Sequence, residues 1–212
     1  MKYHGEPTLK PRLPIVDELI LTVLSQNTSD SNRDRAYASL RERFPTWEQV
    51  LDAPVEDVVA AIRAGGIANI KAARIKSILS EVESREGSID LSRLNKLTDD
   101  EVDGYLRSLP GVGPKTVACV LTFAMGRAAF PVDTHVHRVT RRLGWIDAKT
   151  SADQAHRVLT PAIPEEIRYE LHMLFITHGR TVCKATTPLC SECVLLDLCD
   201  AGPRLLSEGI AR

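Results

Sequence analysis

The amino-acid sequence predicts an all-α protein, on three observations. Apolar residues recur at intervals of three and four, which places them on one face of a helix, and glycines close several of these runs. Convincing two-residue alternation, the pattern of a half-buried strand, is absent from the sequence. The 212 residues are enough for one or two compact domains with a buried core.

The first four helices are indicated by their apolar faces. These faces consist of Ile15, Leu19, Val23 and Leu24, then Ala36, Leu40 and Phe44, then Val55, Val58, Val59 and Ile62, and then Ile75, Ile78, Leu79 and Val82. The third face stops at Gly65 and Gly66 and the fourth at Gly87, since glycine commonly ends a helix. We therefore expect four amphipathic helices before residue 87.

Three later helices are indicated by their starts. Thr98 and Ser151 each have a glutamate or glutamine three residues further on, which is the spacing of a capping box. Pro114 suits the first turn of a helix, where its missing N–H leaves no bond unmade, and that helix should end near Gly126. The chain is then a helical body followed by a cysteine loop and a short tail.

Composition and charge exclude some classes of protein. Hydrophobic residues make up 43% and charged residues 26%, as in ordinary globular proteins, and no apolar run reaches the roughly 18 residues of a membrane span. Residues 1–14 are polar and carry no apolar segment of the secretory type, so we expect a cytoplasmic protein. The net charge of −1 gives no overall sign of nucleic-acid binding. A local basic face is indicated by Arg138, Arg141 and Arg142, although a solvated charged face has the same pattern.

The segment LPGVGPKT at 109–116 lies between two predicted helices. Gly111 and Gly113 allow a tight turn, and backbone N–H groups there, with the start of the next helix, can hold one DNA phosphate. Such contacts fix the register of DNA without reading its sequence. A plain corner between two helices uses the same residue types, so the hairpin alone leaves both interpretations open.

Four of the five cysteines are close together in sequence, and they are Cys183, Cys190, Cys193 and Cys199. In a cytoplasmic protein such a group indicates a metal or iron–sulfur site rather than disulfides. Four thiolates hold either a tetrahedral zinc ion or an iron–sulfur cube, and the C-x6-C-x2-C-x5-C spacing leaves both open. Cys119 stands apart, and we expect it to be a small buried hydrophobic residue.

Three motifs occur in a characteristic order: the hairpin at 109–115, the segment VDTH at 132–135 and the cysteine loop. Together they resemble the endonuclease III family of helix-hairpin-helix DNA glycosylases, over nearly the whole chain. The resemblance implies that Lys115 is the catalytic nucleophile and that Asp133, eighteen residues later, is the second essential group. Relatives that remove adenine opposite an oxidised guanine carry another residue at the lysine position, so Lys115 favours the bifunctional, lyase-competent branch. Without the resemblance, Lys115 would be read as a surface lysine and Asp133 as a helix N-cap.

The resemblance also implies the architecture and the cofactor. It predicts a six-helix barrel with the helix-hairpin-helix motif at 8–127, and a second helical domain, from 1–7 and 128–212, that holds a [4Fe–4S] cluster on the four cysteines. Double-stranded DNA would bind in a cleft flanked by the two domains, with Lys115 and Asp133 on opposite sides. We expect a monomer that is associated with the nucleoid.

A glycosylase extrudes its target nucleotide, and a protein side chain fills the gap that is left in the base stack. By resemblance, Asn27 in the loop 25–30 is a polar plug, where the family commonly has glutamine. Ile67 in the loop 65–69 matches an apolar wedge that parts base steps. Otherwise Asn27 is a loop or capping residue, and Ile67 is a core contact at a helix start.

The predicted function is excision of oxidised or ring-saturated pyrimidines from duplex DNA, followed by cleavage 3′ to the abasic site. A neutral lysine amine attacks C1′ of the damaged nucleoside, loss of the base leaves a Schiff base, and β-elimination breaks the strand. A carboxylate near C1′ stabilises the positive charge that develops on the sugar and helps to move the lysine proton. Two alternatives stay open: a non-catalytic DNA-binding protein with a structural cluster, and a glycosylase with another base preference.

Overall fold

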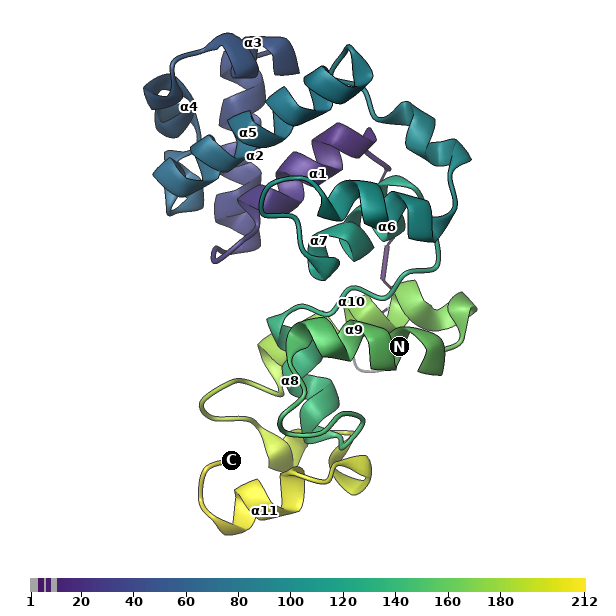
Figure 1. Ribbon diagram of the computed structural model, residues 1–212. Helices are drawn as coiled ribbons and strands as arrows, with labels where there is room; N and C mark the ends of the chain where they lie inside the picture. The colour runs from purple at the N-terminus through teal and green to yellow at the C-terminus, as the bar shows by residue number, and fades with distance from the viewer. Residues whose placement is uncertain (1–3, 6, 9–10) are drawn as a thin grey trace. The chain divides into compact units, whose positions relative to one another are not determined.

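Helices are the only regular secondary structure in the residues that the computed structural model describes, which are 4, 5, 7, 8 and 11–212 (Figure 1). The all-α prediction is confirmed. The α-helices are α1 (Ile15–Leu24), α2 (Asp30–Arg43), α3 (Trp47–Asp52), α4 (Val55–Ala61), α5 (Ala68–Glu86), α6 (Asp99–Arg107), α7 (Pro114–Cys119), α8 (Thr134–Arg142), α9 (Ala152–Ala162), α10 (Arg168–Thr181) and α11 (Gly202–Ser207). The short turns are η1 (Arg63–Gly65), η2 (Ser92–Lys96), η3 (Val120–Ala124, of π type), η4 (Glu165–Ile167), η5 (Cys190–Glu192) and η6 (Leu196–Leu198). Within this described part, no helix combines the length and the apolarity of a membrane span.

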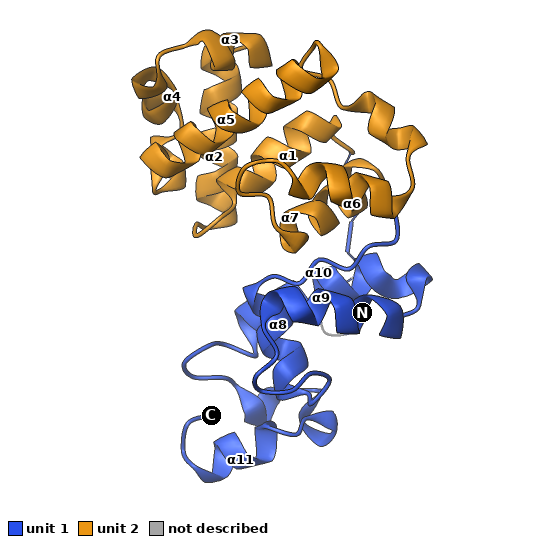
Figure 2. Ribbon diagram, viewed as in Figure 1, with its two compact units in different colours: residues 1–11, 127–212 blue, residues 12–126 orange. Residues whose placement is uncertain are grey.

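The chain divides into two compact units, which Figure 2 colours separately. One unit is Arg12–Gly126 and contains α1 to α7. The other unit is formed by two segments of the chain, Met1–Pro11 and Arg127–Arg212, and contains α8 to α11. The segment 1–7, which the resemblance assigns to the cluster domain, includes residues 1–3 and 6 that lie outside the described part.

Helix α1 is the centre of the unit 12–126. Eight of its ten residues are buried, and it packs against α2, α5, α7 and η3 (Figure 1). A helix that is covered on several sides is apolar around most of its circumference. This explains why Val16 and Ile20 are buried together with Ile15 and Leu19, where the sequence predicted a single apolar face.

The predicted helix starts and stops are confirmed by their local contacts. Thr98 and Ser151 form complete capping boxes at the starts of α6 and α9. Pro114 is the first residue of α7, which continues through η3, and Gly126 follows with a φ of 66°. A Cβ on Gly126 would collide with the Arg12 guanidinium, so this glycine is needed for space as well as for its backbone conformation.

The unit that contains α8 to α11 has its own apolar core, in which α8 packs against α9 and α10. Buried Arg168, at the start of α10, donates from Nε to the Ile163 carbonyl at 2.9 Å and from Nη1 to the Ala128 carbonyl. Cys183 and Cys199 pack against this core, which therefore positions the cysteine loop. The core residues are Phe130, Val132, Val136, Val139, Leu143, Ile146, Ala155, Leu159, Ile163 and Phe175.

Candidate functional site

Lys115 lies where the glycine hairpin meets α7. Gly111 turns the hairpin with a φ of 70°, a left-handed conformation that favours glycine, whereas Gly113 precedes the helix with an extended backbone. A Cβ on Gly113 would meet no atom within 4 Å, so the backbone is open on that side. Both glycines suit the close approach of a phosphate, although only Gly111 needs glycine for its dihedral angles.

The Lys115 amine is held by the end of α1. Its Nζ donates to Ser25 Oγ at 3.3 Å, and the Ser25 hydroxyl donates to the Thr22 carbonyl at 2.6 Å. Ser25 belongs to the loop 25–30, which also contains Asn27. The contact between Ser25 and Lys115 could not be predicted, because these residues are 90 positions apart.

The two residues expected to enter DNA share an unusual backbone. Asn27 has a φ of 51° and Ile67 a φ of 40°, and no other non-glycine residue in the described chain has a positive φ. Asparagine adopts this left-handed conformation readily, whereas for a β-branched side chain such as isoleucine it is a strained outlier. Ile67 is 48% exposed, which contradicts the alternative of a core contact. Ser29, rather than Asn27, caps α2 by accepting from the Asn32 N–H.

Asp133 is the N-cap of α8, and its Oδ1 accepts the Val136 N–H at 2.8 Å. The capping interpretation is confirmed, and the carboxylate has a second oxygen for other chemistry. Two buried histidines hold the two residues before Asp133. His156 Nε2 accepts the Val132 N–H at 3.3 Å, and His172 Nδ1 donates to the preceding proline carbonyl at 2.8 Å. The backbone that leads into α8 is therefore held by hydrogen bonds with two histidine side chains.

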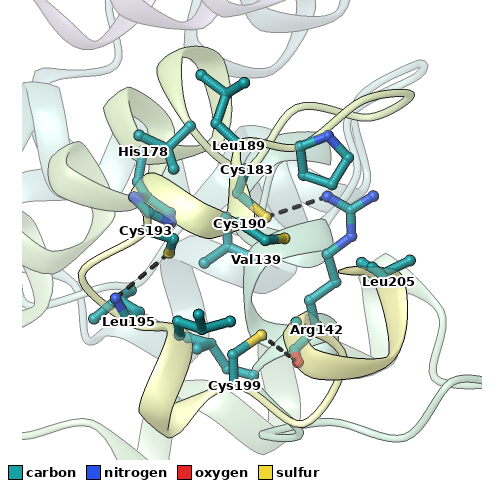
Figure 3. Close-up of a pocket in the computed structure, with 15 residues that line it drawn as sticks. Val139, Arg142, His178, Cys183, Leu189, Cys190, Cys193, Leu195, Cys199 and Leu205 are labelled. Atoms are coloured by element: carbon teal, nitrogen blue, oxygen red, sulfur yellow. Dashed lines mark hydrogen bonds between the residues drawn. The ribbon is translucent and has the colours of Figure 1, made fainter. Parts of the chain in front are cut away.

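The four cysteines line one apolar pocket, shown in Figure 3. Its open volume, including the solvent at its mouth, is about 380 Å³. Its walls are covered by Val139 of α8, by Leu143, which follows the last residue of α8, and by Leu189 and Leu195 of the loop. Burial, followed by the charge of the three other thiols, raises the pKa of Cys190, so the sulfur atoms lie within electrostatic reach of one another.

Hydrogen-bond donors point at these sulfur atoms. Arg142 Nη1 donates to Cys183 Sγ at 3.3 Å, and the Leu195 N–H donates to Cys193 Sγ at 3.4 Å (Figure 3). His178 Nε2 lies 3.6 Å from the same Cys193 sulfur. No set of three or more His, Cys, Asp or Glu side chains in the described chain converges as the ligands of a single ion do. Four thiols around one pocket, with hydrogen-bond donors directed at their sulfur atoms, fit an iron–sulfur cube.

Gly202 leaves room beside one of the cysteines. A Cβ at this position would lie 2.7 Å from Leu196 Cδ1 and 3.5 Å from Cys199 Sγ, so it would fill space next to a sulfur atom. The Cys199 thiol itself donates to the Arg142 carbonyl at 3.1 Å. The surroundings are thus shaped for a group that occupies the pocket together with the thiols.

Two of the three arginines after Asp133 support the cysteine loop. Arg142 donates to two carbonyls just after Cys183, at 2.7 and 3.0 Å. Arg138 donates to the carbonyls of Cys183 and Gly179, at 2.9 and 2.7 Å. Arg141 is exposed. For Arg138 and Arg142 the structure therefore replaces both expectations, a phosphate contact and a solvated face, with a structural role.

Two protein-family models match parts of this chain. The family model described as HhH-GPD superfamily base excision DNA repair protein matches residues 20–165. The model described as the iron–sulfur binding domain of endonuclease III matches residues 183–199. The chain belongs to the endonuclease III family. The hairpin with Lys115 lies within the first match, and Cys183 and Cys199 are the ends of the second.

Individual relatives support the family assignment. Endonuclease III of Bacillus subtilis is 34% identical over 99% of this chain and 91% of its own length, and endonuclease III of Thermotoga maritima is 35% identical over 86% and 81%. A putative DNA glycosylase of Arabidopsis thaliana is 40% identical over 84% of this chain, which spans 58% of that relative's length. A solved structure of endonuclease III in a non-covalent complex with DNA aligns with a TM-score of 0.83 at 30% identity, over 97% of this chain and 92% of that chain.

Several predictions from the sequence are confirmed by these matches. This endonuclease III family member is a base-excision-repair enzyme of the DNA glycosylase and AP lyase class, and it binds DNA. It carries a [4Fe–4S] cluster, so zinc, which the cysteine spacing alone allowed, is rejected. The alternative of a non-catalytic DNA-binding protein is also rejected.

Proposed function

We propose that this enzyme excises oxidised or ring-saturated pyrimidines from double-stranded DNA and cuts the strand 3′ to the resulting abasic site. Lys115 is the nucleophile, and Asp133 is the carboxylate that acts with it. The observation that carries the proposal is the position of Lys115 Nζ, beside the neutral Ser25 hydroxyl and at the start of the helix that follows the hairpin.

The chemistry follows from an amine and a carboxylate. The neutral Lys115 amine forms a bond to C1′ as the glycosidic bond breaks, and the damaged base leaves with the electron pair and takes up a proton. Ring opening of the sugar gives a protonated Schiff base between Nζ and C1′. Loss of a proton from C2′ then expels the 3′ phosphate, and hydrolysis frees the lysine. The Asp133 carboxylate stabilises the positive charge on the sugar and accepts the lysine proton.

The DNA contacts that we propose have separate tasks. Gly111 and Gly113 hold a phosphate through backbone N–H groups, which fixes the register of the duplex. Asn27 and Ile67 enter the base stack when the damaged nucleotide is extruded. The exposure of both side chains and the strained backbone of Ile67 support this assignment, because strain persists mainly where a function requires the conformation.

The cluster has a structural task in this proposal. Cys183, Cys190, Cys193 and Cys199 are its ligands, and Arg142 donates to one of the ligand sulfurs. When bound, the cluster joins four thiolates and fixes the loop that contains them. Glycosyl transfer and β-elimination move protons and electron pairs only, so no step needs an electron from the cluster.

The domain assignment and the location are also proposals. We assign the six-helix barrel, expected at 8–127, to the unit 12–126, and the cluster domain, expected at 1–7 and 128–212, to the other unit. A chain whose substrate is damaged duplex DNA works where chromosomal DNA is, and we propose the cytoplasm, next to the nucleoid. It acts as a monomer.

Borohydride trapping tests the nucleophile, because borohydride reduces a Schiff base to a stable amine. Wild-type protein should become covalently attached to a duplex with one abasic site, and Lys115→Ala should lose both attachment and strand cleavage. Lys115→Ala should still bind a non-reactive abasic analogue, since the hairpin is unchanged. The exposed Lys149 provides the control, and Lys149→Ala should be trapped like the wild type.

Trapping of Lys115→Ala would refute the nucleophile assignment. The substrate is tested separately, with duplexes that each carry one defined lesion. Base release should be fastest from ring-saturated or oxidised pyrimidines, and a preference for a purine lesion would contradict the proposed substrate while leaving the nucleophile in place.

A further inference from the structure

Lys71 is a lysine on α5 whose surface is 0% exposed. Its Nζ donates to the carbonyls of Leu24 and Gly65, each at 2.7 Å. Leu24 is the last residue of α1 and Gly65 is the last residue of η1, so the ammonium group lies at the carbonyl ends of two helical segments. Burial lowers the pKa of Lys71, because the charged form loses its hydration.

A buried ammonium group commonly makes a protein less stable than a well-packed apolar side chain of similar volume would. Its presence therefore indicates a task other than stabilisation. Lys76, on the same helix, shows a more ordinary use of lysine. Its Nζ donates to carbonyls at the end of α3, among them that of Ala53, and its side chain is only half-buried. Lys71 differs because it is fully enclosed and because it joins two segments that each lead to a residue with a left-handed backbone.

Two residues with left-handed backbones follow within three positions of the carbonyl partners of Lys71. Asn27, with a φ of 51°, is three residues after Leu24, and Ile67, with a φ of 40°, is two residues after Gly65. The Lys71 backbone N–H also makes the first helical bond of α5, to the Ile67 carbonyl at 3.2 Å. A β-branched residue such as Ile67 keeps such dihedral angles only where the surrounding structure enforces them, whereas asparagine adopts them readily. Lys71 is the side chain that bonds to the base of both loops.

Arg74, three residues further along α5, extends the connection to the hairpin. Its Nη1 donates to Oε1 of Gln26, the neighbour of Asn27, and a Cβ on Gly111 would collide with its guanidinium. Helix α5 therefore contacts the loop 25–30, the loop 65–69 and the hairpin through side chains on adjacent turns.

We propose that Lys71 is a positioning residue for base extrusion, which clamps the loops 25–30 and 65–69 so that Asn27 and Ile67 face DNA in their left-handed conformations. The inference rests on the DNA contacts proposed above. Without the clamp, the strained Ile67 backbone relaxes, the loop of Asn27 loses its anchor at Leu24, and the two side chains leave the positions that fill the base stack. Release of an intact base then slows. Cleavage at an abasic site, which has no base to extrude, slows much less.

The test compares two rates in Lys71→Met, which keeps the length of the side chain and removes the ammonium group. One rate is single-turnover base release from a duplex with one ring-saturated pyrimidine, and the other is single-turnover cleavage of a duplex with a preformed abasic site. We expect base release to fall about 100-fold, as for a misplaced group, and cleavage to fall far less. The fluorescence rise of a 2-aminopurine beside the lesion, which reports unstacking, should be lost.

Lys76→Met is the matched control, because it removes a carbonyl-bonded lysine from the same helix without touching either loop. It should keep the wild-type ratio of the two rates. Equal losses of both rates in folded Lys71→Met, or no loss in either, would overturn the proposal. If circular dichroism shows that Lys71→Met does not fold, Lys71→Gln and Arg74→Met are tested for the same split. A wild-type protein that neither releases bases nor cleaves abasic sites would instead overturn the proposed function.

Discussion

The unit 12–126 and the loop 183–199 are held together by different interactions. In the unit, α1 is surrounded by other helices, and fully buried side chains such as Leu19 and Ile20 stabilise it by leaving water. In the loop, regular structure consists of the three-residue turns η5 and η6, and most side chains are exposed or half-buried. The loop is fixed by its thiols and by hydrogen bonds from Arg138 and Arg142.

This difference separates the parts on which the proposed nucleophile and the cofactor depend. Lys115, Asn27 and Ile67 belong to the unit that is stabilised by apolar burial, whereas Asp133, the proposed second catalytic group, belongs to the unit that also contains the cysteine loop. The four proposed ligand cysteines belong to a loop whose order we expect to depend on what the thiols hold. A substitution in the loop should therefore change cluster absorption and iron content, and a substitution in the unit 12–126 should change the free energy of unfolding of that unit.

Cys190→Ser should remove the cluster completely. The broad absorption near roughly 400 nm that a thiolate-bound cluster gives should disappear. Limited proteolysis should then cut within 183–199 and spare the segment 12–126. Cys119→Ala, which changes a buried cysteine of α7 far from the loop in sequence, is the control and should keep the absorption. An unchanged spectrum in Cys190→Ser would contradict the ligand assignment.

Leu19→Ala should lower the free energy of unfolding by about 2–5 kcal/mol, because it leaves a cavity at the centre of the unit 12–126. Denaturant titration followed by circular dichroism measures the change, and the native protein should keep the cluster absorption. Leu198 is 73% exposed, so Leu198→Ala should change the free energy by less than about 0.5 kcal/mol. Simultaneous loss of the absorption in Leu19→Ala would show that the two parts are not independent.

Gly202→Ala should destabilise the cluster unit by about 1–3 kcal/mol, because the added methyl group overpacks against Leu196. The measurement is iron content per protein chain together with the unfolding midpoint, and both should fall. Gly104 in α6 has no atom within 4 Å of an added Cβ. Gly104→Ala should therefore raise stability slightly, as alanine does in an exposed helix, and should leave iron content unchanged.

Ile67→Asn should raise the free energy of unfolding by about 1 kcal/mol, since asparagine tolerates the left-handed backbone better than isoleucine. Base release should slow, because the apolar wedge is gone. Ile70 is 58% exposed on ordinary helical backbone three residues later, so Ile70→Asn should bring no gain in stability. A loss of stability in Ile67→Asn would mean that the positive φ stores no strain.

The sequence predicted those features of the fold that depend on near neighbours. Helical periodicity and capping boxes such as those of Thr98 and Ser151 involve residues within four positions of one another, so they are visible without the fold. The order of hairpin, Asp133 and cysteine loop predicted the family for a similar reason, since each motif is short. The surroundings of the cluster were partly visible: His178 precedes Cys183 by five residues, yet nothing in that spacing predicts its distance from Cys193.

Contacts between distant segments could not be predicted. Lys71 lies four and seven residues before Ile75 and Ile78, so its spacing places it on the buried face of α5. Nothing in the sequence predicts that its ammonium group bonds to the Leu24 carbonyl, 47 positions away. Local preference is misleading at Ile67, because isoleucine disfavours the left-handed conformation that the tertiary structure imposes. Arg142 has the pattern of a phosphate-binding residue and instead bonds to the cysteine loop.

The unit that carries the cluster is assembled from both ends of the chain, and His4 Nε2 lies 3.2 Å from His178 Nδ1, 174 positions later. Proteins are synthesised from the N-terminus, so the unit 12–126 leaves the ribosome whole while the cluster unit is still missing most of its residues. The fourth proposed ligand, Cys199, follows the other three in the chain, so the full set of thiols becomes available only after the unit 12–126 has been made. Iron incorporation would then discriminate between chains that extend past Cys199 and chains that terminate before it, and only the former could acquire the cofactor on four thiols.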